Sequence, residues 1–170
     1  GTFRLRDSEQ RAKWYPSASD AVASTAVYGL PEHCGDALRN ATLVACPGCY
    51  PTAALLALRP LIAADLLADD LVIDAKSGLS GAGKTPSERT HFSECHGNVA
   101  SYGIFSHRHA AEIEQELQKT VTFVPHLVPL DRGILETIYG RLRPGRDADE
   151  VGVALHEAYL KSAFVRLRGT

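Results

Sequence analysis

The sequence has neither an excess of charge of one sign nor a long apolar segment, and each absence excludes a class of partner. Its 170 residues carry a formal net charge of −2, so a basic surface for nucleic acid or an anionic membrane is not expected. The most apolar stretch, Leu55–Leu67, is broken by Arg59 and Pro60 and is shorter than the ~18 residues of a membrane span. We therefore expect a globular protein that binds neither nucleic acid nor membranes.

Methionine is absent, and only four cysteines are present. A natural gene product begins with methionine, whereas this chain begins at Gly1, so we expect a piece of a longer protein. Four unevenly spaced cysteines are too few for a disulfide framework of this length. A reducing, cytoplasmic environment is therefore expected, in which cysteines serve as packing groups, metal ligands or nucleophiles.

Helical and strand patterns alternate along the chain, which predicts a domain of mixed α and β structure. Helices are expected at residues 7–14, 52–67, 109–119 and 147–160, with an interruption of the second at Pro60 and a cap on the last at Asp147. Strands are expected at residues 42–46, 70–75, 121–130, 133–142 and 163–167. The third and fourth strands are joined by a short turn, so we predict that they form an antiparallel pair at the centre of the sheet.

The segment Cys46–Cys49 (CPGC) lies between a predicted strand and a predicted helix. A cysteine at a helix N-terminus sits beside unpaired amides and the positive end of the helix dipole, which favour the reactive thiolate. The Pro-Gly turn presents Cys49 outward, and we interpret this residue as a nucleophile. Three alternatives stay open: a buried packing cysteine, a thioredoxin-like redox pair of the two cysteines, and a zinc site with His91 and either Cys95 or His96.

The segment Gly78–Thr85 (GLSGAGKT) satisfies the phosphate-binding P-loop pattern and follows a predicted strand. A P-loop NTPase fragment is therefore an alternative function. Pro86, however, stands where the P-loop helix would begin, and it biases Thr85 away from helical backbone angles. We favour a loop whose exposed amides and Lys84 hold an anionic group without NTPase chemistry, with a flexible surface loop as the remaining possibility.

The triplet His107-Arg108-His109 opens the predicted amphipathic helix. Histidines titrate near neutral pH and suit proton transfer, and an arginine can pair with a carboxylate or phosphate. Alone, such a triplet is also compatible with a solvated helix start. Beside a candidate nucleophile, we interpret it as an acid–base group.

Together these motifs resemble the catalytic region of the N-acetyl-γ-glutamyl-phosphate reductases of arginine biosynthesis. The resemblance covers nearly the whole chain, in the family's order, at residues 3–5, 28–32, 44–53, 77–84, 107–113 and 132–135. The family also has an N-terminal Rossmann half with a glycine fingerprint for NADP and a C-terminal segment that returns to it, and neither pattern is found here. The resemblance thus implies that residues 1–170 form the catalytic, substrate-binding and dimerisation domain. Its implied fold is α+β, a mixed, largely antiparallel sheet with helices packed on one face, like the C-terminal domain of glyceraldehyde-3-phosphate dehydrogenase.

The same resemblance implies NADPH-dependent reduction of N-acetyl-γ-glutamyl phosphate to N-acetylglutamate semialdehyde, with release of phosphate and a thioester on Cys49. It assigns proton transfer to His109 and next to His107. It assigns substrate binding to the polar side chains of Arg108, Lys84 and Tyr102. It places NADP(H) near the small residues of the glycine-rich loop, which are Ser77, Gly78, Ser80 and Gly81.

The resemblance further implies that NADP(H) is bound mainly by the missing Rossmann domain, so the isolated piece is expected to be inactive. A homodimer or homotetramer that acts on a small acyl phosphate is expected, and no metal. The alternative function that is not enzymatic is that of a non-catalytic oligomerisation domain.

Overall fold

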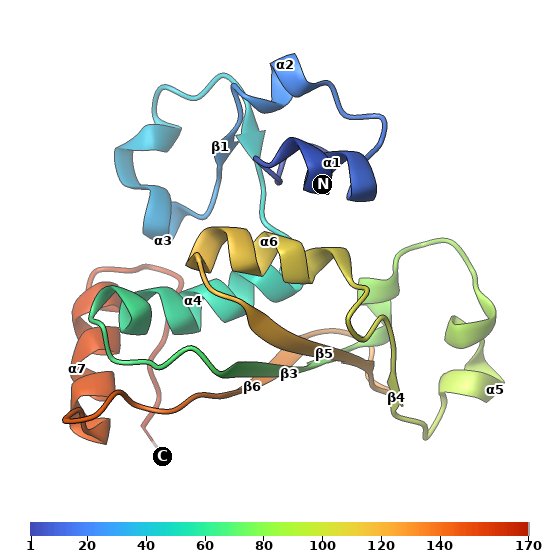
Figure 1. Ribbon diagram of the computed structural model, residues 1–170. Coiled ribbons are helices and arrows are strands. Elements are labelled where there is room, and N and C mark those ends of the chain that lie inside the picture. The colour runs from blue at the N-terminus through green and yellow to red at the C-terminus, as the bar shows by residue number, and fades with distance from the viewer. Residues whose placement is uncertain (170) are drawn as a thin grey trace.

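A computed structural model describes residues 1–169, in which a four-stranded sheet carries two long helices on one face (Figure 1). The helices are α1 (Ser8–Trp14), α2 (Asp20–Ala23), α3 (Pro31–Cys34), α4 (Cys49–Ala63), α5 (Phe92–Cys95), α6 (Arg108–Leu117) and α7 (Ala148–Tyr159). Short 3-10 helices are η1 (Gly35–Leu38), η2 (Leu79–Ala82) and η3 (Glu88–Thr90). The strands are β1 (Val27–Tyr28), β2 (Val44–Ala45), β3 (Leu71–Ser77), β4 (Ala100–Ser101), β5 (Val121–Leu127) and β6 (Ile134–Tyr139).

The main sheet has the order β4-β5-β3-β6. Strand β3 pairs with β5 in parallel and with β6 antiparallel, and β4 pairs with β5 antiparallel. The expected mixed, largely antiparallel sheet with helices on one face is therefore confirmed. The predicted antiparallel pair of residues 121–130 and 133–142 is wrong, because β3 lies between these two strands and the central pair is parallel.

The connection between β5 and β6 crosses the carboxyl end of β3, which explains why so short a link does not make a hairpin. The amide of Val128 donates to the carbonyl of Ser77 (3.0 Å), and the amide of Gly78 donates to that of Gly133 (2.9 Å). A Cβ on Gly78 would lie 2.8 Å from the backbone nitrogen of Arg132, so this crossing requires glycine. These hydrogen bonds hold the start of the glycine-rich loop, which follows β3, against the segment that connects β5 to β6.

The core lies between the sheet and helices α4 and α6. Alternate residues of β3, such as Ile73 and Ala75, are fully buried against this layer, as the period of a strand requires. Helix α4 contributes Leu55 and Leu58, and α6 contributes Ile113. A smaller unit made of α1, α2, α3 and the parallel pair β1–β2 lies on the far side of α6 from the sheet (Figure 1).

Helix α4 begins three residues earlier than expected and runs without interruption through Pro60 to Ala63. Proline has no amide proton, so Pro60 cannot bond the carbonyl of Leu56, one turn earlier. The hydroxyl of Tyr159 on α7 donates to that carbonyl instead, at 2.5 Å. Helix α7 therefore replaces the missing bond, which explains why the predicted break does not occur.

Of the predictions near the C-terminus, the helix start at Asp147 is confirmed and the last strand is not. Helix α7 begins with the expected cap, since the carboxylate of Asp147 accepts from the amide of Glu150 and the side chain of Glu150 accepts in return (both 3.0 Å). The predicted strand at residues 163–167 is wrong, because these residues pair with no strand in the described chain and Phe164 is 90% exposed.

Glu136 lies on the core side of β6, opposite Ala75 of β3. Both of its carboxylate oxygens are buried without a hydrogen-bond partner among residues 1–169. Burial raises the pKa of Glu136 from 4.5 to about 8, so this carboxyl group is protonated in the folded chain at neutral pH.

We predict that replacing Glu136 with Gln removes a pH-dependent loss of stability. Below pH 4.5 both the folded and the unfolded chain hold the proton. Between pH 4.5 and about 8 only the unfolded chain ionises, so the wild-type free energy of unfolding falls, by at most about 1.4 kcal/mol per pH unit. Urea unfolding across this range measures the effect. Glu157→Gln, at an exposed position of α7, is the control; parallel pH profiles for wild type and Glu136→Gln would contradict the prediction.

Candidate active site

Cys49 is the first residue of α4 and is separated from the end of β2 by only three residues. Its side chain is exposed, whereas Tyr50 and Pro51 behind it are buried, so the helix start is anchored and the thiol faces outward. Pro51 lies in the first turn of the helix, where a backbone amide has no intrahelical acceptor, so its lack of an N–H costs nothing. The amide and the hydroxyl of Thr52 both donate to the carbonyl of Gly48 (both 2.9 Å). The predicted position of Cys49 at a helix N-terminus is confirmed.

The carboxylate of Glu112 holds this helix start from the side of α6. Its Oε1 accepts from the amide of Gly48 and from the hydroxyl of Tyr28, both at 2.8 Å, and Nη1 of Arg4 lies 3.6 Å from Oε2. Glu112 is only 1% exposed. Burial raises the pKa of Glu112, while the two hydrogen bonds and Arg4 oppose that rise. Sequence reasoning gave this residue no role, although it stands one helical turn after His109.

His109 packs directly against the residue that precedes the nucleophile. A Cβ on Gly48 would lie 2.5 Å from Nε2 of His109, so only glycine allows the ring to come this close. Gly48 itself has ordinary extended backbone angles (φ −66°, ψ 159°), so it serves close packing and not the tight turn that the sequence suggested. Nδ1 of His109 is buried and has no hydrogen-bond partner in the described chain.

The two histidines of the triplet stand edge to face, with ring centroids 4.8 Å apart. The backbone amide of His109 donates to Nδ1 of His107 (3.1 Å), so neutral His107 carries its proton on Nε2. Burial, with the nearby Arg108, lowers the pKa of His107 to about 4. Burial first, and then His107 and the cations Arg108 and Arg4, lower the pKa of His109 to about 3. Both rings are therefore neutral at pH 7, and of the two only His109 has a buried ring nitrogen, Nδ1, without a hydrogen-bond partner among residues 1–169.

Aromatic side chains support the histidines from the sheet side. Tyr50 stands edge-on to both His107 and His109, with 5.8 Å between centroids, and it also contacts Phe123. The hydroxyl groups of Tyr50 and Tyr102 lie 3.0 Å apart. Burial, and the hydrogen bond to Tyr102, raise the pKa of Tyr50, so these hydroxyls act as neutral hydrogen-bonding groups.

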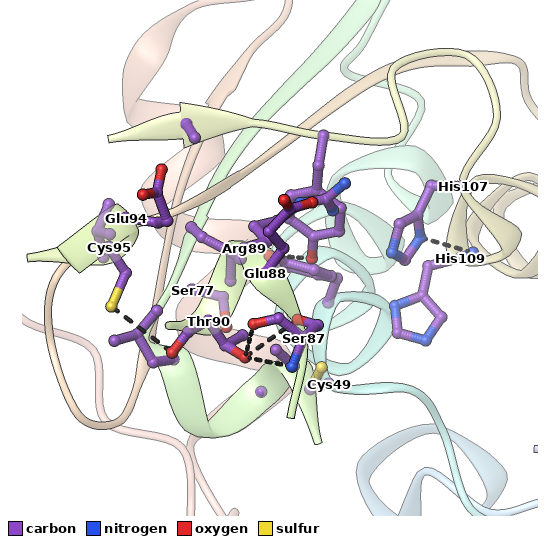
Figure 2. A pocket seen from close by; sticks show the side chains of 18 of the residues that line it. Cys49, Ser77, Ser87, Glu88, Arg89, Thr90, Glu94, Cys95, His107 and His109 are labelled. Carbon is purple, nitrogen blue, oxygen red and sulfur yellow. Dashed lines mark hydrogen bonds between the residues drawn. The ribbon is translucent and has the colours of Figure 1, made fainter. Parts of the chain in front are cut away.

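Most of the predicted site residues line one cavity of about 960 Å³. These are Cys49, Ser77, Gly81, Tyr102, His107, Arg108 and His109. Figure 2 shows Cys49 and the two histidine rings on one side of this pocket, with Glu94 and Cys95 on the other. Lys84, Gly78 and Ser80 do not line it, and Lys84 is exposed. Sequence reasoning missed Arg89, which lines the pocket from η3 in a segment without a recognisable motif.

The glycine-rich loop does not form a P-loop. The amides of Gly78, Leu79 and Ser80 donate to the carbonyls of Gly133, Leu130 and Asp131, so they are not available to a phosphate. No helix follows Lys84 before η3 at Glu88–Thr90. The hypothesis of a P-loop NTPase is therefore wrong, because the chain uses these amides to bind its own turn.

The geometry supports neither a zinc site nor a redox pair of cysteines. Residues 1–169 contain no cluster of His, Cys, Asp or Glu side chains that could hold a metal ion. All four cysteines are free, and Cys46 is exposed outside the pocket that Cys49 lines. Within the same residues, no helix is long and apolar enough to cross a membrane.

Residues 49–170 match the sequence profile of the family described as "Semialdehyde dehydrogenase, dimerisation domain". The chain is 42% identical to N-acetyl-gamma-glutamyl-phosphate reductases of Bacillus cereus and Bacillus anthracis, over 99% of its own length and 51% of theirs. It thus spans about half the length of the curated relatives it matches.

Solved structures with low sequence identity share the fold. Aspartate semialdehyde dehydrogenase II from Vibrio cholerae superposes with a TM-score of 0.63 at 19% identity, covering 88% of this chain and 57% of that one. Aspartate semialdehyde dehydrogenase from Francisella tularensis gives 0.58 at 13% identity, covering 83% and 54%. With the profile match, which includes Cys49 and both histidines of the pocket, these findings establish that the chain belongs to the semialdehyde dehydrogenase dimerisation-domain family.

Proposed function

We propose that this chain supplies the acyl-transfer and proton-transfer groups of an NADPH-dependent reductase that converts N-acetyl-γ-glutamyl phosphate to N-acetylglutamate semialdehyde in arginine biosynthesis. One observation carries the proposal: an exposed cysteine at a helix N-terminus opens into a pocket lined by two neutral histidines, the half-buried His107 and the buried His109. The reductases of the two Bacillus species, similar over nearly the whole chain, support this choice of substrate. The cytoplasm is the proposed location, since all four cysteines are free.

The first step is acyl transfer to Cys49. Its sulfur attacks the acyl carbon of the substrate, the bond from that carbon to the phosphate oxygen breaks, and inorganic phosphate leaves. The product is a thioester on Cys49. The amides at the start of α4 face the developing negative charge, and the positive end of the helix dipole stabilises it. Arg108 lines the same pocket and supplies a cation for the phosphate.

His109 is the proposed proton-transfer group. Its Nε2 lies against Gly48, the neighbour of the nucleophile, and Glu112, one turn further along the same helix, accepts from the amide of Gly48. A neutral ring accepts the thiol proton, later donates it to the oxyanion formed on reduction, and recovers it when the aldehyde leaves. His107 is the second choice, because its Nδ1 is already engaged by a backbone amide.

The residues of this pocket fit the nicotinamide ring of NADP(H), which is its reactive end, and do not fit its pyrophosphate. Ser77 and Gly81 line the pocket beside Cys49, which leaves a small-residue wall against which a flat ring can lie. The amides of Gly78 and Ser80 are taken by the chain, so this loop offers no cradle for a pyrophosphate. When bound, NADPH supplies the hydride that reduces the thioester; this chain's residues hold the acyl group and move its protons.

The open face of the sheet supports self-association as a second role. No helix in the described chain covers this face, and Leu135 and Tyr139 on β6 are 65% and 56% exposed (Figure 1). The same face carries the ion pairs of Asp74 with Lys76 and His126, and such a mixture of apolar and polar side chains is typical of an interface between subunits. We propose that two copies of this chain pack through it, in keeping with a family described as a dimerisation domain.

The acyl-transfer step can be tested on this chain without a cofactor. Mixing it with N-acetyl-γ-glutamyl phosphate should release one equivalent of phosphate in a burst and add one N-acetylglutamyl group, located at Cys49 by peptide mapping. Cys49→Ser should abolish the burst, because a serine hydroxyl is a far weaker nucleophile than a thiolate. Cys46→Ser, three residues away and outside the pocket, should retain it. A full burst from the Cys49→Ser variant would refute the nucleophile assignment.

The two histidines can be ranked by the rate of the same burst under single-turnover conditions. His109→Asn should slow acylation by roughly 10²–10⁴, the usual worth of a general acid–base group, whereas His107→Asn should have a smaller effect. Circular dichroism and thermal unfolding should establish that both variants are folded. If His107→Asn shows the larger loss, the order of the two residues is reversed.

Self-association through the sheet is tested by sedimentation. Leu135→Glu places a charge in the middle of the proposed interface and should shift the chain toward monomer. Leu160→Glu is the matched control, since Leu160 is equally exposed (66%) but lies just past α7, away from the sheet face. Equal association of both variants would place the interface elsewhere.

A further inference from the structure

We infer that Arg89 binds the α-carboxylate of the acyl-phosphate substrate and thereby selects for an amino acid derivative. The inference rests on the proposed function and deepens it, because it names the group that recognises the end of the substrate remote from Cys49.

The guanidinium of Arg89 lies over the ring of Tyr102, which belongs to a group of aromatic side chains that extends to the residue after Cys49. Its Cζ lies 5.3 Å from the ring centroid of Tyr102, and that ring stands 5.5 Å from the ring of His107. The hydroxyl of Tyr102 lies 3.0 Å from that of Tyr50, the residue after Cys49. An arginine stacked on an aromatic face keeps its planar set of N–H donors free for a carboxylate.

The turn that carries Arg89 is fixed by its own side chains. The hydroxyl of Thr90 accepts from the amide of Ser87 (3.2 Å) and lies 3.0 Å from its hydroxyl, which closes a capping box around η3. A guanidinium presented from such a turn loses less freedom on binding than one on an irregular loop.

Charge in the pocket points to the same role. The charged side chains that line it are Arg89, Arg108, Glu88 and Glu94. Arg89 is exposed and makes no ion pair with any carboxylate of residues 1–169, whereas other exposed arginines, such as Arg39 and Arg141, do. In Figure 2 Glu94 lies beside Cys95, on the side away from the histidines, where it repels an anion. Glu88, the sequence neighbour of Arg89, lines the same pocket, but within residues 1–169 Arg89 forms an ion pair with neither glutamate. Its guanidinium is therefore free to pair with an anionic group that extends from Cys49 into the pocket.

The substrate has two anionic ends separated by a short aliphatic chain, and the pocket has two arginines. Arg108 lies between the two histidines in sequence, lines the same pocket as Cys49, and is suited to the phosphate. Arg89 is separated from His107 by the ring of Tyr102 and is suited to the carboxylate. The pairing of two cations with two anions fixes which way round the substrate lies.

The test compares two ligands that differ only at the proposed contact. N-acetyl-L-glutamate and its α-carboxamide, N-acetyl-L-isoglutamine, both place a γ-carboxylate toward Cys49. Their dissociation constants are obtained from protection of Cys49 against iodoacetamide, followed by peptide mapping. We expect wild type to prefer N-acetyl-L-glutamate about tenfold, as a charge-assisted pair requires. Arg89→Gln should abolish the preference, while Arg141→Gln, an equal change of charge far from the pocket, should retain it.

Three outcomes would overturn the inference. The first is an equal preference in wild type and Arg89→Gln. The second is loss of the preference in Arg108→Gln alone, which would assign the carboxylate to Arg108. The third is no preference in wild type. The phosphate burst separates these results from a failure of the proposed function: a normal burst without ligand preference overturns only the role of Arg89. Ligand preference without a burst overturns the acyl-transfer chemistry and leaves Arg89 as a carboxylate-binding residue.

Discussion

The hydrogen bond from the Gly48 amide to the buried carboxylate of Glu112 is the contact on which the site depends. It joins the start of α4, which carries Cys49, to the helix that carries His107, Arg108 and His109. Because Glu112 also accepts from Tyr28 and faces Arg4, the small N-terminal unit is fixed to the same point. A buried carboxylate is costly unless it is paired, and Oε2 of Glu112 has only the ion pair with Arg4, so the loss of any one of these partners weakens the whole junction.

Local sequence patterns were sufficient for elements whose stability is local. The capping box at Asp147 set the start of α7, and the Pro-Gly-Cys segment placed Cys49 at a helix N-terminus. Chemistry that is confined to short motifs, such as the His107–His109 triplet, could be found in the same way. These features depend on residues within one turn of each other, which is the range that a sequence pattern describes.

Features that depend on distant partners could not be predicted. The place of β3 between β5 and β6 is set by hydrogen bonds between residues 77–80 and 128–133, some fifty positions apart. Helix α4 continues past Pro60, where the hydroxyl of Tyr159, on another helix, donates to the carbonyl of Leu56 that the proline leaves unpaired. Gly48 was correctly singled out for the wrong reason, since its neighbour His109, and not its backbone angle, excludes a side chain. Arg89 lacks any motif, and only its position over Tyr102 marks it.

The glycines of residues 78–83 are commonly taken as a sign of mobility, but here Gly78 permits close contact between two backbone segments. Hydrogen bonds to the turn at 130–133 make this loop a fixed wall of the pocket. A ligand that enters therefore meets a surface already in its final shape and orders little of this loop on arrival. Affinity on this side of the pocket then depends on how well the ligand fits against small side chains. The conformational entropy lost on binding is mainly that of the ligand and not that of the loop.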